Sequence, residues 1–255
     1  MRFLPSIILL STLAACAAPP GSAGDHPVQC PLDGGQPASL DTAIHDYLLA
    51  HGDVVLQALQ ENGKRQQAAQ MEQSRQALAG AHAALFDDAT DPVAGNPAGG
   101  VTVVEFFDAE CPFCKKVAPD LERLIAENSD IRVVYKEYPI LGPGSVTAAK
   151  AALAAVRQGK YEAFHNALMA DATPEHQLTE ALILEIAKQR GLDVKRLTSD
   201  MQAPEIAAKI TANVTLARQI GVNGTPALII GDRLIPGAMP YDALVQAVSE
   251  VRQRN

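Results

Sequence analysis

The stretch V-T-V-V-E-F-F-D-A-E-C-P-F-C-K-K, residues 101–116, joins a short apolar run to two cysteines that are separated by two residues. Val101 to Phe107 is rich in β-branched and aromatic side chains and is too short for a typical helix, so it predicts a buried strand. Cys111 to Glu127 has helical spacing, with Pro112 suited to the first turn and Pro119 expected to kink the helix. The cysteine pair is therefore predicted to lie where a strand gives way to a helix.

The residues that follow extend this unit into an α/β fold. Ile131 to Tyr138 reads as a second strand, and the strand–helix–strand order predicts a parallel pair with a right-handed crossover. Helical spacing interrupted by glycines and prolines then predicts several short helices between residues 145 and 220. The last expected elements are an antiparallel hairpin, Ala227 to Ile230 with Arg233 to Ile235, and a closing helix, Tyr241 to Arg252.

Before the cysteine motif, the chain changes character three times. Residues 17–39 are rich in Pro, Gly, Ala and Ser and predict a flexible tether, in which Cys30 has no obvious disulfide partner. Asp41 to Phe86 is helical in pattern, but its second half is so polar that it either projects into solvent or packs a sparse apolar stripe against another chain. Asp91 to Gly100, with two prolines and three glycines, predicts a linker.

The first residues, MRFLPSIILLSTLAAC, have the features of an export signal: Arg2, an apolar run from Ile7 to Leu13, and small residues before Cys16. The run is shorter than the roughly 20 residues that a membrane-spanning helix needs. Its end resembles the bacterial lipobox, which implies lipidation of Cys16 and a lipoprotein tethered in the cell envelope. Ala17 stands where an Asp often signals inner-membrane retention, which favours the outer membrane. The alternative is an ordinary secretory signal cut at a nearby Ala-x-Ala site.

Charge and composition exclude one class of partner. The chain has 21 basic and 29 acidic residues, a formal charge of -8, and no cluster of Lys and Arg. The basic footprint of a nucleic-acid-binding protein is therefore missing.

The C-x-x-C motif predicts thiol–disulfide chemistry. A helix N-terminus offers backbone N–H donors and a positive dipole end, which lower the pKa of a thiol placed there. Cys111 is thus predicted to be the attacking sulfur, and Cys114, one turn inward, to resolve the mixed disulfide. The bland alternatives are an inert disulfide, which would add little stability across so small a loop, and a structural zinc site, for which the chain lacks a second ligand pair.

Three stretches together resemble the DsbA family of thioredoxin-like proteins: residues 105–116, V-V-Y-K-E-Y-P-I at 133–140, and G-V-N-G-T-P-A-L-I-I-G at 221–231. The resemblance covers most of the chain from Val101 to Arg252. Residues 46–59, D-Y-L-L-A-H-G-D-V-V-L-Q-A-L, are similar to the N-terminal helical segment of its Com1- and ScsC-type branch.

The resemblance implies a thioredoxin-like fold with no cofactor beyond the Cys111–Cys114 disulfide, and no metal. Its partners would be exported cysteine-containing proteins and a membrane redox partner, and the N-terminal helical segment would make a homo-oligomer. The implied divisions are a signal peptide (1–15), a flexible tether (16–40), an oligomerisation segment (41–90) and a catalytic domain (91–255) with its helical insertion at about 145–220.

Three further site residues follow from the resemblance. It implies a cis peptide at Thr225-Pro226 facing the cysteines, where an arbitrary X-Pro bond would be read as trans. It places an acidic proton-transfer residue at Glu105, beneath Cys114. From the residues alone, Glu105 lies on the apolar face of its strand, where a carboxylate is costly unless it is neutral or paired, for example with Lys136 or water.

Phe113 departs from the His that strongly oxidising members carry between the cysteines, and Asp108 and Glu110 add nearby negative charge. A less stabilised thiolate is therefore expected, which favours an isomerase or reductase over a strong oxidant. The alternatives are a plain dithiol oxidase, a copper-handling thiol protein and a non-catalytic lipid-anchored interaction protein. The six His residues show no ligand spacing and are interpreted as surface or packing residues.

Overall fold

The computed structural model describes residues 39–254. The signal segment, Cys16 and Cys30 lie outside the described residues, so their expected roles remain predictions. The chain divides into two compact units, one that reaches to Ala58 and one that begins at Leu59. The boundary predicted at residue 91 divides the oligomerisation segment from the catalytic domain. The division into two compact units does not test this boundary.

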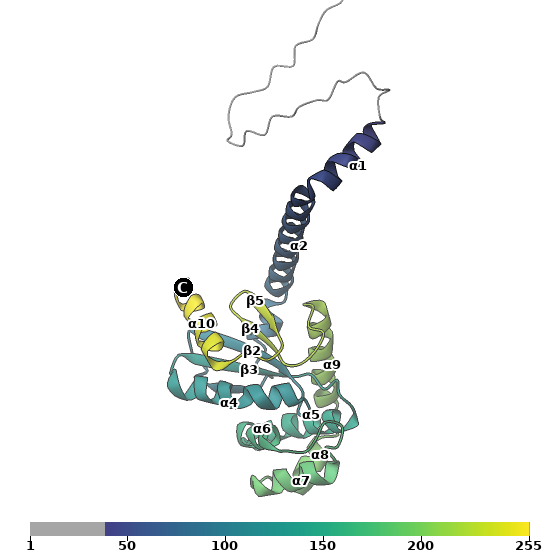
Figure 1. Ribbon diagram of the computed structural model, residues 1–255. Helices are drawn as coiled ribbons and strands as arrows, with labels where there is room; N and C mark the ends of the chain where they lie inside the picture. The colour runs from purple at the N-terminus through teal and green to yellow at the C-terminus, as the bar shows by residue number, and fades with distance from the viewer. Residues whose placement is uncertain (1–38, 255) are drawn as a thin grey trace, which may run out of the picture. The chain divides into compact units, whose positions relative to one another are not determined.

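The centre of the second unit is a five-stranded sheet in the order β1-β3-β2-β4-β5 (Figure 1). β2 and β3 are parallel and in register from Val101 opposite Ile131 to Phe107 opposite Glu137, whereas the other neighbours are antiparallel. The strands are β1 (Val93–Gly95), β2 (Val101–Phe107), β3 (Ile131–Glu137), β4 (Ala227–Ile230) and β5 (Arg233–Pro236). The structure confirms the predicted α/β thioredoxin-like fold.

Ten helices accompany the sheet in the described part of the chain. The helices are α1 (Leu40–Ala50), α2 (Gly52–Gly80), α3 (His82–Phe86), α4 (Pro112–Glu127), α5 (Pro143–Val156), α6 (Tyr161–Ala170), α7 (Glu180–Gln189), α8 (Val194–Asp200), α9 (Pro204–Gln219) and α10 (Tyr241–Arg252). The inserted helical region predicted from the sequence is α5 to α9. None of the described helices is both long and apolar enough to cross a membrane.

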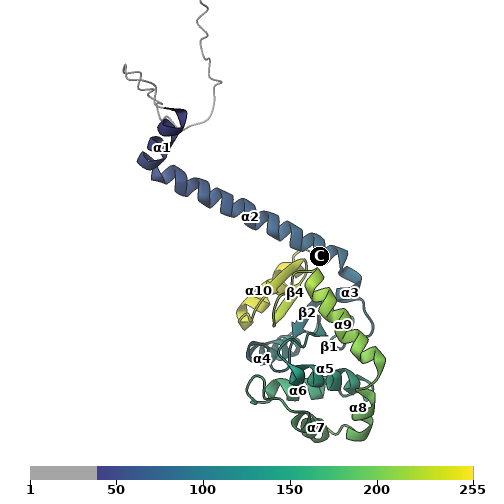
Figure 2. The same ribbon diagram turned by 90° about the vertical axis from the view of Figure 1, so that its right-hand side faces the viewer.

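Two apolar clusters cover the two faces of the sheet. One contains α4, α10 and the helices α5 to α7, which pack on the face that carries Val103 and Phe107. The other contains the end of α2, α3 and the end of α9, which pack on the face of Val104 and Phe106; Figure 2 shows α3 and α9 on the same side of the sheet. Burial on both faces explains why β2 reads as an almost continuous apolar run.

The structure corrects the expected linker between residues 91 and 100. Val93 to Gly95 form β1, which pairs with β3 as an edge strand. Asp91 is buried and forms ion pairs with Lys136 and Lys209, so this stretch is fastened to the sheet and to α9. The strand was not predicted because it has only three residues. So short a strand leaves almost no period-two hydrophobic pattern among the surrounding prolines and glycines.

Candidate active site

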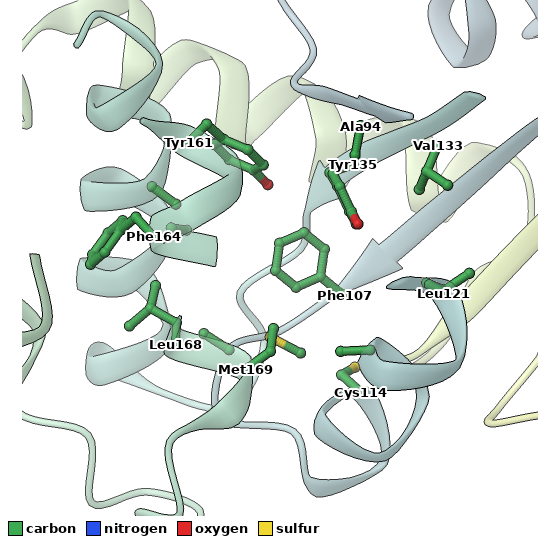
Figure 3. Packing of buried hydrophobic residues seen from close by; sticks show 14 of the residues in the cluster. Ala94, Phe107, Cys114, Leu121, Val133, Tyr135, Tyr161, Phe164, Leu168 and Met169 are labelled. Atoms are coloured by element: carbon green, nitrogen blue, oxygen red, sulfur yellow. The ribbon is translucent and has the colours of Figure 1, made fainter. Parts of the chain in front are cut away.

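The two cysteines lie at the start of α4, as the sequence predicts. Cys111 is the N-cap residue, and its Sγ accepts a hydrogen bond from the backbone N–H of Cys114 at 3.4 Å. Both are free thiols and both are buried, Cys114 completely. Figure 3 shows Cys114 among buried apolar side chains from β2, α4 and α6, including Phe107 and Met169.

The two thiols have opposite acidities. The pKa of Cys111 is lowered from 9.0 to about 6, chiefly by the hydrogen bond from the Cys114 side chain; burial opposes the shift, and donors from Thr225, Cys114 and Phe113 add to it. The pKa of Cys114 is raised far above its ordinary value by burial, by its hydrogen bond to Cys111 and by the negative charge of Glu105. At neutral pH this arrangement favours a thiolate at Cys111 and a protonated thiol at Cys114.

Glu105 is buried in the middle of β2, with Tyr135 and Leu228 as its neighbours on the two adjacent strands. Its Oε1 has no hydrogen-bond partner among the described residues. Burial, followed by the negative charge of Cys111, raises the pKa of this carboxyl from 4.5 to about 8. The side chain can therefore hold or release a proton near neutral pH. Its negative charge in turn raises the pKa of the Cys114 thiol.

Pairing of Glu105 with Lys136, one of the possibilities left open by the sequence, is wrong. Lys136 stands opposite Phe106 in the register, and its Nζ binds Asp91 and the carbonyl of Ala84 on the other face of the sheet. Successive side chains of a strand point to opposite faces, so these two neighbours in the sheet cannot meet.

The Thr225–Pro226 peptide is cis, as the resemblance implies, and it directly precedes β4. The Cys111 thiol donates to the Thr225 carbonyl at 3.3 Å, which places this loop against the redox pair. Residues 114 positions apart in the chain thus meet at one site.

Asp108 and Glu110, the two carboxylates near the thiol, both accept hydrogen bonds. Asp108 accepts from the backbone N–H groups of Glu110, Ile140 and Leu141 at 2.7–3.0 Å. Neither carboxylate is among the causes of the Cys111 pKa shift. Hydrogen bonds hold both carboxylates in place without removing their charge, so the expectation that these two residues oppose the thiolate stays a prediction.

Two side chains that flank the motif fasten it to the helical insertion, and no sequence pattern predicted either set of contacts. Glu110 accepts from Leu178 N at 2.9 Å and from Ser145 Oγ at 3.0 Å. Lys115 Nζ donates to the carbonyls of Asp171 at 2.8 Å and Thr173 at 3.1 Å. No sequence signal identifies the backbone partners, because they lie 56 to 68 residues away in the chain.

The structure also places Phe113 and His165, two further residues considered in the sequence. Phe113 is 62% exposed and presents an apolar ring beside the motif. His165 is buried against Phe107 and Tyr135, and burial lowers its pKa to about 3, so it is a packing residue. Within residues 39–254 there is no group of three or more His, Cys, Asp or Glu side chains placed to hold a metal ion.

The comparison with protein families decides the assignment. Residues 102–249, more than half of the chain, match the DSBA-like thioredoxin domain. The chain belongs to this family. DsbA-like thioredoxin oxidoreductases act through a redox-active disulfide without an external cofactor.

Solved DsbA-like structures resemble the chain over most of its length. A thioredoxin-like oxidoreductase from Silicibacter pomeroyi is 46% identical, with a TM-score of 0.64, and the match covers 67% of this chain and 97% of that one. A mutant of ScsC from Proteus mirabilis, which carries a linker deletion and one substitution, is 30% identical, with a TM-score of 0.71; the match covers 86% of this chain and 100% of that one.

Among curated proteins, the chain is 32% identical over 164 residues to the Na(+)/H(+) antiporter NhaA 3 of Salinispora tropica. That match takes in 64% of this chain and 25% of the antiporter, so the chain spans about a quarter of the length of this relative.

Proposed function

We propose that this protein is a thiol–disulfide oxidoreductase that exchanges disulfides with cysteine-containing proteins outside the cytoplasm. The observation that carries the proposal is the contrast between the two sulfurs at the start of α4. Cys111 has a pKa of about 6 and is capped by the N–H of Cys114, whereas burial holds Cys114 protonated. One thiolate is ready to attack, and the second thiol is kept for the later step.

The reaction proceeds in two exchanges when the reduced protein meets a client disulfide. The Cys111 thiolate attacks one client sulfur, a mixed disulfide forms, and the other client sulfur leaves as a thiolate. Cys114 then passes its proton to the carboxylate of Glu105 and attacks the sulfur of Cys111. The Cys111–Cys114 disulfide forms, and the first client sulfur is released as a thiolate. Oxidation of a client dithiol is the same sequence in reverse.

The test of these roles is trapping. Cys114→Ser is expected to accumulate mixed disulfides with exported proteins, because Cys111 still attacks while intramolecular resolution is lost. Cys111→Ser is expected to accumulate none on a non-reducing gel. Equal trapping by the two variants would show that the roles are wrongly assigned.

The Thr225–Pro226 loop is proposed to bind the client next to the reacting sulfurs. Pro226 lacks a backbone donor, and the Thr225 backbone is placed to pair with an extended client segment. The 3.3 Å approach of Cys111 Sγ to the Thr225 carbonyl supports this role. The family likeness further suggests that Pro226 discourages metal capture by the two thiols.

The helical segment at residues 41–90 is proposed to make the protein a homo-oligomer. Large apolar side chains are more than one-third exposed along the segment from residue 40 to residue 59. These are Leu40, Ile44, Tyr47, Leu48, Leu49, Val54, Val55, Leu56 and Leu59. Such a concentration of exposed apolar surface marks an interaction site, here a second or third copy of the same segment. Several active sites in one particle would suit isomerase activity, because a client could be held through repeated exchanges.

The location is proposed from the leader together with the family. One similar solved structure, 38% identical, is a periplasmic thioredoxin-like protein from Salmonella enterica serovar Typhimurium. The signal-like residues 1–15 and the lipobox-like Cys16 support a cell-envelope protein that is lipid-anchored to the outer membrane, with a membrane protein as its redox partner. Incorporation of labelled fatty acid into the wild type and not into Cys16→Ser tests the anchor.

A further inference from the structure

A long hollow extends away from the redox centre and is not used by the chemistry above. A cleft of about 920 Å³ lies between α2, the loop that leads to Thr225 and Pro226, and the end of β5. A second hollow of about 580 Å³ lies farther along α2 and β5. The two share Gln70, Ser74, Leu234 and Pro236 and so form one continuous space, the α2–β5 trough.

One wall of the trough is a polar face of α2. Gln70, Gln73, Ser74 and Ala77 line the larger cleft, and their spacing of three, four and seven residues places them on a single face of the helix. A glutamine amide both donates and accepts hydrogen bonds, as does a serine hydroxyl. These groups match the alternating N–H and C=O groups of a polypeptide main chain.

The side facing this wall carries both apolar and charged side chains, with Asp232, Arg233 and Arg254 around the outer part of the trough. Leu234 lines both parts of the trough, together with Pro236. β5 is also the last strand of the sheet, and its outer edge pairs with no other strand in the described chain. Hydrogen-bonding groups on the α2 side and the apolar side chains of Leu234 and Pro236 opposite them suit an extended segment, whose side chains alternate about its main chain.

The wall is fixed in place by packing and by an ion pair within the second compact unit. Leu78 and Ala81, directly after the polar face, are buried in the apolar cluster beneath the sheet. Arg75 lies 3.1 Å from Asp232, in the turn between β4 and β5. The polar face of α2 is therefore held at a defined distance from the redox site.

The trough begins where the client must react. Thr225 and Pro226 line its first part, and the Thr225 carbonyl is 3.3 Å from Cys111 Sγ. Among the described residues, the amides of Gly224 and Thr225 donate to no backbone carbonyl. A client whose cysteine is joined to Cys111 thus finds free main-chain groups first and the amide groups of α2 next.

Building on the exchange activity proposed above, we propose that α2 is part of the client-binding site. Gln70, Gln73 and Ser74 bind the main chain of an extended, unfolded client segment that runs from Thr225 into the trough. From Gln67 to Ala77 a helix rises about 15 Å, which an extended chain covers with about four to five residues. The site therefore selects clients that are unfolded over about five residues on one side of the reacting cysteine.

The experiment measures how fast the reduced full chain reduces mixed disulfides between glutathione and single-cysteine peptides. The peptides carry two or six residues on either side of the cysteine, and oxidised glutathione is the short substrate. The longer peptide is expected to react about tenfold faster on one side, the worth of one to two hydrogen bonds. Gln70→Ala with Gln73→Ala should remove this gain through a higher KM and leave the rate with oxidised glutathione unchanged.

The matched control is Gln66→Ala with Gln76→Ala, because these two exposed glutamines of α2 line neither part of the trough. The control should keep the full length dependence. Equal rates for both double variants on every peptide would overturn the proposal. So would a faster reaction of the long peptides after deletion of residues 17–38, which would assign the trough to the protein's own tether. Failure of the wild type to reduce oxidised glutathione would instead overturn the exchange function itself.

Discussion

At the scale of single residues, hydrogen bonds at a helix start set the chemistry. The thiolate of Cys111 forms without a cation between the two cysteines. Its pKa is lowered by hydrogen bonds from the Cys114 thiol, from Thr225 and from two backbone N–H groups. Phe113 in place of a histidine therefore removes one source of thiolate stabilisation while several others remain.

We expect the Cys111 thiolate to titrate near pH 6. Because the thiol pKa is lowered from 9.0 to about 6 in the folded protein, thiolate absorbance and the rate of alkylation should rise with a midpoint near that pH. Absorbance of the thiolate in reduced Cys111→Ser, which retains Cys114, is the control and should stay flat below about pH 8. A midpoint near about pH 8.5 in the wild type would show that these hydrogen bonds do not stabilise the thiolate.

Glu105→Gln tests the buried carboxyl. Its pKa is raised from 4.5 to about 8 on folding, so the folded state binds more protons between these values and stability falls as pH rises through that window. In the oxidised protein Cys111 carries no charge, but burial still raises the pKa of Glu105, so stability should fall as pH rises above about 4.5. Glu105→Gln should remove this contribution to the pH dependence in urea unfolding.

The same variant should slow the resolving step. Removing a general base lowers such a rate by about a hundredfold or more, so stopped-flow traces should show the mixed disulfide accumulating. A purely structural role for Glu105 would change stability and leave both the rate of resolution and its pH profile as they are in the wild type.

At the scale of elements, the redox motif is fastened to the helical insertion from both ends. Glu110 receives two hydrogen bonds from the segments at Ser145 and Leu178, and Lys115 donates to two carbonyls between α6 and α7. The insertion therefore holds the segment that carries the cysteines, in addition to covering one face of the sheet.

Glu110→Ala is expected to destabilise the protein by about 1–3 kcal/mol, because a buried backbone N–H and a hydroxyl lose their acceptor. Urea unfolding measures the loss. Glu122→Ala, on the exposed side of α4, is the matched control and should change stability by less than about 0.5 kcal/mol. Similar losses in the two variants would mean that the Glu110 contacts are not what holds the motif.

At the scale of the whole molecule, the exposed apolar side chains of the N-terminal segment have a predicted consequence for activity. Deleting residues 41–58, all of them exposed and outside the compact unit that holds the sheet, should lower the oligomeric state in light scattering and weaken the unscrambling of a multi-disulfide substrate by the reduced protein. Reduction of oxidised glutathione is the control for the redox centre. A full-length monomer would remove the oligomerisation claim, and rapid oxidation without unscrambling would leave a plain dithiol oxidase.

Much of the fold was predictable because the relevant signals are local. The predicted bounds of β2, β4 and α10 match the structure, since an apolar run or a helical repeat is carried by neighbouring residues. Cys111 and Cys114 were likewise identified by their spacing and by the helix that follows. For Thr225 and Pro226 the family resemblance was needed, because nothing local distinguishes a cis from a trans X-Pro bond.

What only the tertiary structure decided depends on contacts between distant segments. The three residues of β1 form a strand because they pair with the edge of β3. Lys136 binds Asp91 because successive side chains of a strand point to opposite faces, which directs Lys136 away from Glu105. The positions of Glu110, Lys115 and the α2–β5 trough follow from packing that brings together segments far apart in the sequence. Sequence patterns record which residues seek burial or begin a helix, whereas the partner of each buried polar group is fixed only once the layers have packed.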